Sequence, residues 1–215
     1  MRLQSHPFPV SDTIIYMNAL PTYEEIVSLH KKHAPSQAAF DLVFTHCQIV
    51  WELAEQLIQK SSLSVNSELV KVGCLLHDIG VYRLYLPDGE IDHANYIKHG
   101  TEGYTLLKEE GFDELLSRFA SCHTGVGLTK DEIEEEDLPI PPADYFAETP
   151  EEQLVMYADK FHTKTTPPKF MTADTYAEKQ KKFGEEKAER FRQFQKRFGT
   201  PNLQALAEKY GSEII

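Results

Sequence analysis

Six side chains that can bind a metal ion occupy inward-facing positions in this 215-residue sequence. Each lies on, or at the end of, a stripe of apolar residues that has the spacing of one helix face. The six residues are His46, His77, Asp78, His99, His123 and Asp159. Burying so many polar groups is costly unless something satisfies them, and one or two metal ions would satisfy all six. Imidazoles together with carboxylates suit Mn²⁺, Fe²⁺, Co²⁺, Ni²⁺ or Zn²⁺ better than calcium.

A single histidine on an apolar stripe is more often a hydrogen-bonded core residue than a metal ligand. This sequence has four of them, together with an adjacent His77-Asp78 pair and a lone inward-facing Asp159. Separate hydrogen-bond partners for all of these groups are difficult to arrange. The pair lies just before Gly80, a helix stop signal, and two adjacent ligands reach one ion most easily where a helix ends. The pattern therefore favours a metal centre.

The hydrophobic periodicity predicts the helices that must position these residues. The expected helices cover residues 22–32, 37–60, 66–77, 93–110, 112–123, a stretch that starts at 150 and carries Asp159, a long charged helix over 173–198, and 203–210. Residues 129–150 read as a short helix and a long surface loop, and residues 13–17 as a short strand or an irregular packing segment. A seam of aromatic residues on the long helix is expected to dock onto the rest of the chain or to form a dimer contact, and it consists of Phe183, Phe191, Phe194 and Phe198.

Charge and composition indicate which kinds of partner and which cellular compartment to expect. The formal net charge of −12 opposes extended nucleic-acid binding, so we expect no nucleic-acid partner. Three cysteines without a C-x-x-C pair argue against a disulfide framework. The longest apolar runs are only a few residues, so the sequence predicts no signal peptide, no membrane span and a cytoplasmic protein.

Three short motifs resemble the H…HD…D signature of the HD-domain superfamily. They are His46, the stretch Leu75 to Gly80 that contains H-D-I-G, and Ala158-Asp159-Lys160. The stretches 99–103 and 123–129 further resemble small stand-alone H-D-I-G proteins, and the resemblance covers roughly residues 38–165. It implies an all-α HD-domain helical bundle over residues 1–165, including the N-terminal segment, with residues 166–215 as a C-terminal helical extension that packs on the same domain.

The same resemblance implies a ligand set. A divalent metal would be held by His46, His77, Asp78 and Asp159, and the remaining two histidines match the extra pair that binds a second metal, with Asp78 bridging the two ions. We favour two metals because both extra positions are filled. The alternative is one metal, with His99 and His123 contacting phosphate.

Members of this superfamily are mostly phosphohydrolases, so the resemblance implies metal-activated water acting on a small phosphate ester, most plausibly a nucleotide or dinucleotide. A nearby cation would offset charge on the phosphoryl oxygens. Arg83 is the first choice, as a catalytic residue beside Asp78, because it follows the His-Asp turn closely. Lys160 is expected at the surface and His162 is a weaker ligand candidate. The other candidate cations are Lys98, Lys130 and Lys164.

Two further readings stay open. Some HD-fold proteins with six ligands of this type are di-iron oxygenases, and others keep the metal site as non-catalytic regulatory modules. Iron content and oxygen uptake separate the first from a hydrolase. The sequence leaves the substrate, the native metal and the oligomeric state open, a homodimer among the possibilities.

Overall fold

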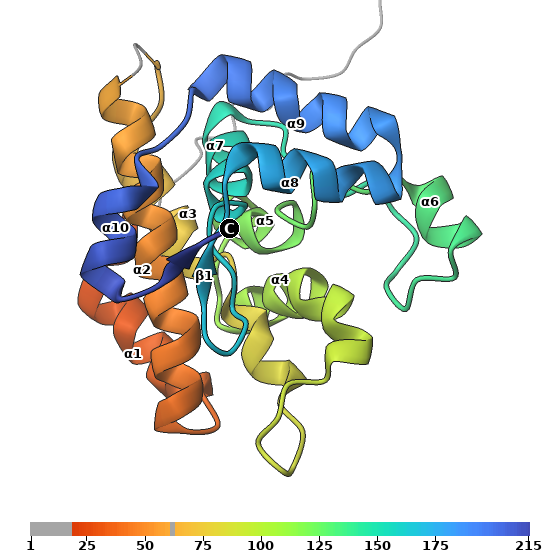
Figure 1. Ribbon diagram of the computed structural model, residues 1–215. Helices are drawn as coiled ribbons and strands as arrows, with labels where there is room; N and C mark the ends of the chain where they lie inside the picture. The colour runs from red at the N-terminus through yellow and green to blue at the C-terminus, as the bar shows by residue number, and fades with distance from the viewer. Residues whose placement is uncertain (1–18, 61–62) are drawn as a thin grey trace, which may run out of the picture.

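The computed structural model describes residues 19–60 and 63–215, and its longest described helix is α2 (Gln37–Lys60), on the left in Figure 1. The predicted segment at 13–17 lies outside the described residues. In chain order, the elements are α1 (Tyr23–His33), α2 (Gln37–Lys60), α3 (Ser67–Leu76), η1 (Ile79–Leu84), η2 (His93–Lys98), α4 (His99–Glu109), α5 (Glu114–Ser121), α6 (Lys130–Glu135), α7 (Pro150–Asp159), β1 (Lys169–Phe170), α8 (Ala173–Gln180), η3 (Lys181–Phe183), α9 (Glu185–Phe198), α10 (Leu203–Tyr210) and β2 (Glu213–Ile214).

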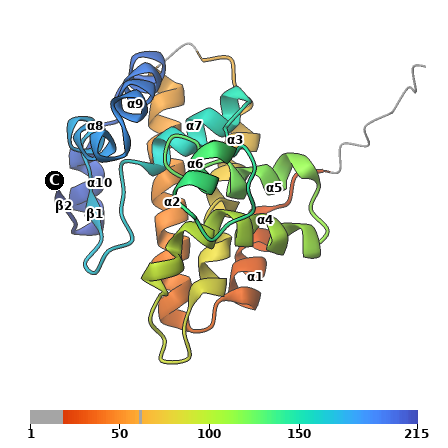
Figure 2. The same ribbon diagram turned by 90° about the vertical axis from the view of Figure 1, so that its right-hand side faces the viewer.

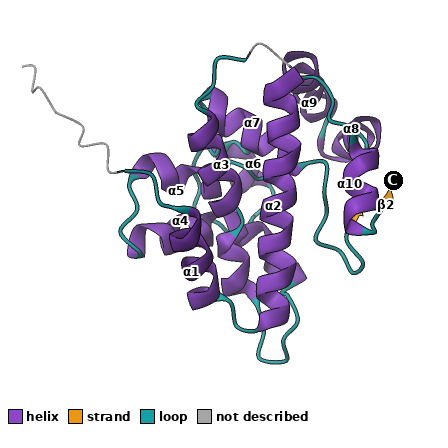
Figure 3. Ribbon diagram, turned by 90° about the vertical axis from the view of Figure 1, so that its left-hand side faces the viewer, coloured by secondary structure: helices purple, strands orange, loops and turns teal. Residues whose placement is uncertain are grey.

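Helix α2 organises the core because its apolar stripe is buried along most of its length. Val43, Val50 and Leu57 are fully buried, and His46 lies on the same face. Helices α3 and α7 pack against α2, and α5 packs against both α3 and α7. Figure 3 shows α8, α9 and α10 on one side of α2 and α1, α4 and α5 on the other. The all-α prediction is confirmed, since the only strands among the described residues are the two-residue β1 and β2.

The turn after α3 brings the chain unusually close to α4. Asn66 caps the start of α3 by accepting a hydrogen bond from the Leu69 backbone N–H, and the helix ends at Leu76. A Cβ atom on Gly80 would lie 2.1 Å from the carbonyl oxygen of His99 and 2.2 Å from the nitrogen of Gly103. Only glycine permits this approach, so Gly80 is what allows the His77-Asp78 turn to sit beside the start of α4.

The prediction of one long helix over 173–198 is wrong. The chain forms α8, a 3₁₀ turn η3 and then α9, because Gly184 adopts a φ of 127° that no helix contains. Phe183, at the break, is therefore 63% exposed and does not join the aromatic seam. Phe191 and Phe198 are buried, and their rings lie 5.2 and 5.7 Å from the ring of Tyr157 in α7.

The C-terminal elements contact the helical bundle at several points (Figure 2). The hydroxyl of Tyr157 donates to the carbonyl of Gly199 at 2.7 Å, and Lys209 and Tyr210 both bind Glu52 of α2. Strand β1 pairs in parallel with β2 at the end of the chain. These contacts agree with the predicted packing of residues 166–215, while the division into 1–165 and 166–215 stays a prediction.

Two shorter predictions also change. The helix expected over 93–110 is divided into the 3₁₀ helix η2 and α4, and the one expected over 112–123 is shortened to α5. Thr149 forms a capping box at the start of α7, with Glu152 as its partner. Within residues 19–60 and 63–215, none of the helices combines the length and the apolar character needed to cross a membrane.

Candidate metal centre

All six residues singled out in the sequence converge on one place in the fold. His46 comes from the middle of α2, and His77 and Asp78 follow α3. His99 begins α4, His123 follows α5, and Asp159 ends α7. The side chains are buried, with Asp159 the most exposed at 12%. Five of the six therefore lie at or just beyond helix ends, where the backbone can direct them toward a common centre.

One group of ligand atoms forms around Asp78 Oδ2. His46 Nε2 lies 3.1 Å from this oxygen and 3.0 Å from Asp159 Oδ1. His77 Nε2 lies 3.5 Å from Asp78 Oδ2 and 3.4 Å from Asp159 Oδ1, and the two Nε2 atoms are 3.3 Å apart. One ligand atom from each of these four residues lies within 4.8 Å of all the others.

A second group forms around the other oxygen of the same carboxylate. His123 Nε2 lies 3.4 Å from Asp78 Oδ1, and His99 Nε2 lies 3.9 Å from it. The Nε2 atoms of His99 and His123 are 3.0 Å apart. Asp78 is thus shared by the two groups, with one oxygen facing each.

The hydrogen bonds of the outer nitrogens determine which way the imidazole lone pairs point. Nδ1 of His77 lies 2.7 Å from the carbonyl of Cys74, and Nδ1 of His99 lies 2.7 Å from the carbonyl of Tyr96. Nδ1 of His123 lies 3.2 Å from the carbonyl of Phe119. A carbonyl only accepts, so each Nδ1 carries the proton and donates. In the neutral form that a metal ligand needs, each ring directs its Nε2 lone pair at Asp78, which is how second-shell bonds orient ligand histidines.

These residues fit a metal. Inward-facing lone pairs and carboxylate oxygens are all acceptors, and acceptors 3.0 to 3.5 Å apart repel one another unless a cation lies between them. Two ligand atoms that bind one ion at right angles, each about 2.1 Å from it, are about 3 Å apart. Both Asp78 oxygens are buried and have no hydrogen-bond partner of ordinary geometry among the described residues. The donor set of nitrogen and carboxylate oxygen matches first-row transition ions.

Two lysines provide positive charge at the edge of this acid-rich centre. Lys164 forms an ion pair with Asp78 Oδ2 and lies 3.2 Å from His46 Nε2, and Lys160 lies 2.7 Å from Asp159 Oδ2. Burial opposes ionisation of Asp78, but Lys164 and His77 outweigh burial and hold the pKa of Asp78 well below its usual range. Lys160 outweighs burial in the same way and holds the pKa of Asp159 well below its usual range. Both carboxylates are therefore charged.

The pKa values of the histidines shift in different directions, depending on the neighbouring groups. Burial, and then the adjacent His123, lower the pKa of His99 to about 3, and burial also lowers the pKa of His123. These two rings are neutral near pH 7 and available as ligands. Burial also opposes protonation of His77, but the Asp78 carboxylate outweighs it and raises the pKa of His77 well above the ordinary value. A metal at His77 Nε2 must therefore compete with a proton.

Arg83 does not contact this cluster, and the expectation that it faces the phosphate is not supported. Its guanidinium pairs with Glu102 and Glu109, both on α4. The chain after Asp78 continues as the 3₁₀ helix η1, and three residues per turn place Arg83 differently from an α-helix.

Lys160 is buried, so the prediction that it lies at the surface is wrong. Helix α7 ends at Asp159, so the chain is free to turn at Lys160, whose side chain is 7% exposed. Its Nζ donates to the carbonyl of His123 at 2.7 Å as well as to Asp159. Lys164, one of the candidate cations, is the lysine that contacts Asp78.

His162 is outside both ligand groups but touches one of them. Its Nδ1 lies 2.9 Å from Nδ1 of His46, and the two rings stack with centroids 5.2 Å apart. The Lys164 ammonium only donates, so His46 Nε2 accepts and His46 Nδ1 carries the proton. His46 therefore donates to His162, which orients its ring. Burial and the neighbouring His46 lower the pKa of His162 to about 2, so it is a neutral acceptor.

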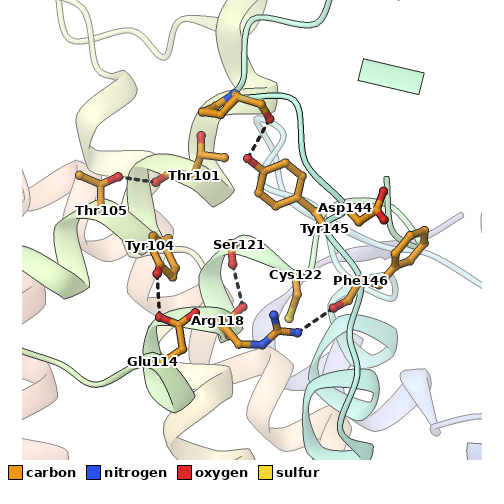
Figure 4. A pocket seen from close by; sticks show the side chains of 11 residues that line it. Thr101, Tyr104, Thr105, Glu114, Arg118, Ser121, Cys122, Asp144, Tyr145 and Phe146 are labelled. Atoms are coloured by element: carbon orange, nitrogen blue, oxygen red, sulfur yellow. Dashed lines mark hydrogen bonds between the residues drawn. The ribbon is translucent and has the colours of Figure 1, made fainter. Parts of the chain in front are cut away.

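A hollow of about 360 Å³ lies between α4, α5 and the segment 141–146 (Figure 4). Its polar side chains are already paired. The Tyr104 hydroxyl donates to Glu114 at 2.7 Å, Arg118 donates to Glu152 at 2.7 Å and to the carbonyl of Phe146 at 3.0 Å, and the Tyr145 hydroxyl donates to a backbone carbonyl. None of the six cluster residues lines this hollow, so it is not the centre of the chemistry.

The helical fold and the six residues around Asp78, which could hold a metal, are those of an HD-type domain. The chain belongs to the HD domain family, whose family model matches residues 43–164. The matched segment contains all six clustered residues and ends at Lys164.

Several curated proteins are similar to parts of this chain. An uncharacterised protein of Methanocaldococcus jannaschii is 42% identical over 120 residues, which is 54% of this chain and 64% of that protein. A tRNA (cytidine(56)-2'-O)-methyltransferase of Picrophilus torridus is 33% identical over 124 residues, 58% of this chain and 32% of that protein. The corresponding enzyme of Thermoplasma volcanium is 33% identical over 121 residues, 56% of this chain and 32% of that protein. The similarity thus spans less than two thirds of each relative.

Among solved structures, the HD domain of the L. monocytogenes phosphodiesterase PgpH is similar at 20% identity, with a TM-score of 0.48, over 86% of this chain and 98% of that one. The same domain in complex with cyclic-di-AMP gives a TM-score of 0.46 at 20% identity, over 79% of this chain and 93% of that one.

Proposed function

We propose that this protein is a metal-dependent phosphohydrolase that acts on a small phosphate ester, with a nucleotide or dinucleotide as its substrate. The observation that carries the proposal is the position of Asp78. Its two buried oxygens face two different groups of ligand atoms and lack ordinary hydrogen-bond partners among the described residues. Family membership supports the same conclusion.

The proposed centre holds two divalent metals. One would be bound by His46, His77, Asp78 and Asp159, and the other by Asp78 together with the two histidines of the second group, His99 and His123. When bound, such ions lower the pKa of water to supply hydroxide at neutral pH and polarise phosphoryl oxygens. A single ion in the first group, with the second group contacting phosphate, is the alternative that metal stoichiometry tests.

The surrounding side chains supply orientation and charge. His162 and three backbone carbonyls direct the four imidazoles inward. Lys164 takes the role first expected of Arg83, because its ammonium reaches Asp78 and is 87% buried at the edge of the cluster. A buried ammonium there attracts the phosphate of a substrate, even though the protein as a whole carries a net charge of −12. Lys160 offsets the charge of Asp159 and remains bound to it.

The deciding experiment combines metal analysis with phosphate release. Protein loaded with Mn²⁺, Fe²⁺ or Co²⁺ is assayed on a panel of nucleotides and dinucleotides, beside the Asp78→Asn variant and an exposed control, Asp88→Asn. We expect close to two metals per chain and phosphate release in the parent and the control, and loss of both in Asp78→Asn. Metal binding without turnover on any substrate would refute the hydrolase and favour a regulatory module.

The oxygenase reading shares the six-residue donor set and is tested separately. Protein purified without oxygen is analysed for iron and then for oxygen uptake with candidate polyols and phosphonates. Substrate-dependent oxygen uptake without phosphate release would replace the hydrolase proposal.

A further inference from the structure

A cavity of about 220 Å³ lies between the turn that follows His123 and the C-terminal helices. Thr124 and Val126 line it from the turn, and Ile97 lines it from η2. Thr124 directly follows His123, and Ile97 lies two residues before His99. Two of its lining residues are thus close in the chain to the second group of ligand residues, although His99 and His123 do not line it.

The C-terminal segment, outside the part matched by the HD family, closes the other side of this cavity. Gln180 at the end of α8, Phe183 in η3 and Lys187 in α9 line it. Lys187 donates to the carbonyl of Gly127 at 2.8 Å, and Arg190 donates to the carbonyl of Val126 at 3.3 Å. Figure 1 shows α6 beside the neighbouring ends of α8 and α9. Two cations thus tie the turn after His123 to the C-terminal helices.

Among the described residues that line the cavity, the one cation is already paired with a carboxylate, and a second carboxylate, Glu136, lines it too. The ammonium of Lys187 lies 2.5 Å from Glu132, and its side chain is only 7% exposed. A second phosphate-sized anion would meet no free cation among the residues that line the cavity, since the lining contains no other lysine or arginine. The cavity is therefore suited to a neutral group.

Gln180 is the uncharged polar side chain of the lining that is buried. It is 8% exposed, and its amide has no hydrogen-bond partner among residues 19–60 and 63–215. The amide is not among the fully buried unpartnered polar atoms, so it stays accessible from the cavity and can bind a ligand with a matching edge. In the hollow of Figure 4, by contrast, the polar side chains bind one another.

Phe183 adds an aromatic surface at the same place. Its ring is 63% exposed and makes no ring contact within the described chain. Exposed aromatic rings stack on the flat faces of bases. Ile97 and Val126 complete an apolar wall.

We propose that this cavity is a subsite for a planar heteroaromatic ring, a nucleobase, with the Gln180 amide binding the edge of the ring and Phe183 stacking on its face. A carboxamide offers one donor and one acceptor side by side, which is the pairing that glutamine uses on a base edge. Pockets for whole drug-sized ligands measure about 300–1,000 Å³, so 220 Å³ holds one ring system and not a complete dinucleotide. The inference rests on the proposed function, because the phosphate of the same ligand would lie at the metal centre.

Nucleoside binding tests the subsite without requiring hydrolysis. Adenosine, guanosine, cytidine and uridine are titrated into the full-length protein by calorimetry, with ribose as the probe that lacks a ring. The variants are Gln180→Leu, Phe183→Ala and the matched control Gln193→Leu, whose side chain is exposed on α9. Circular dichroism and metal content are recorded for each.

At least one nucleoside is expected to bind the parent, and ribose is not. Kd for that nucleoside should rise about tenfold in Gln180→Leu and in Phe183→Ala, and stay unchanged in Gln193→Leu. The exposed Phe183 can be replaced without disturbing the core, so it tests the subsite even if Gln180→Leu unfolds. Equal Kd values in parent and Phe183→Ala, or no nucleoside binding to the parent, would overturn the subsite. Absence of phosphate release alone would refute only the hydrolase.

Discussion

Replacing His162 by phenylalanine tests whether the hydrogen bond behind His46 supports metal binding. The His162 ring is 7% exposed and lies between His46 and Phe170, with centroids 5.2 and 4.9 Å away. Phenylalanine retains this packing and removes Nδ1, which accepts the bond from His46 Nδ1 at 2.9 Å, together with Nε2, which has no hydrogen-bond partner among the described residues. The variant therefore isolates one interaction.

The size of the effect follows from what His46 loses. Its buried Nδ1–H would be left without an acceptor, which costs about 1–3 kcal/mol of stability. The ring is then no longer oriented, and loss of such a second-shell bond lowers metal affinity by about 10- to 100-fold. His162→Asn restores an oxygen near the position of Nδ1 and should recover much of the affinity.

Competition with a chromophoric chelator gives the metal Kd of parent, His162→Phe and His162→Asn, and urea unfolding gives their stability. The expected order of affinity is parent, then His162→Asn, then His162→Phe. Unchanged metal affinity in His162→Phe, or an equal loss in both variants, would show that the bond behind His46 plays no part in metal binding.

Three further predictions concern charge. Lys164→Ala should lower kcat/KM for a phosphate ester by at least about tenfold, while Arg83→Ala stays within about twofold, because of the two only Lys164 contacts Asp78. Steady-state kinetics checks this. A larger loss in Arg83→Ala than in Lys164→Ala would favour Arg83 as the cation that binds the phosphate. Metal affinity should fall as pH falls, because Asp78 raises the pKa of His77 and a proton competes with the ion; titrations from pH 8 to 6 check it, and a flat profile would contradict it. Burial lowers the pKa of His30 from 6.5 to about 4, so the neutral ring adds stability that is complete above pH 6.5 and is lost as pH falls toward 4. The stability advantage of the parent over His30→Gln should therefore shrink by about 3 kcal/mol between pH 7 and pH 4 in urea unfolding, and a constant difference would exclude this role for His30.

His30 also shows what one-dimensional pattern reading overlooks. No local motif gives it a partner, yet the ring is fully buried between the hydroxyl of Tyr82, at 2.9 Å, and the carbonyl of Leu75, at 2.7 Å. Its partners are 52 and 45 residues away in the chain. A periodicity argument has no access to contacts of that range.

The six clustered residues were identifiable from sequence because their signal is local. Each interrupts an apolar helical stripe with a polar group, and periodicity reports which face of a helix is buried. The H-D-I-G turn adds a short motif whose glycine is required by the close approach of the chain to α4. The boundaries of α2 follow from the same stripe.

Sequence alone therefore determined the helical class, the HD signature and which polar residues must face inward. Burial patterns and helix stops depend on residues that are close together in the chain, so they can be recognised without the tertiary structure. Only the tertiary structure decided that Lys164, not Arg83, contacts Asp78, that His162 supports His46, and that Gln180 faces a cavity beside the turn after His123. Those outcomes depend on where a helix ends, as at Asp159, and on how a glycine such as Gly184 redirects the chain. Small changes of backbone direction at such points move side chains by many ångströms, and the packing of distant segments settles them.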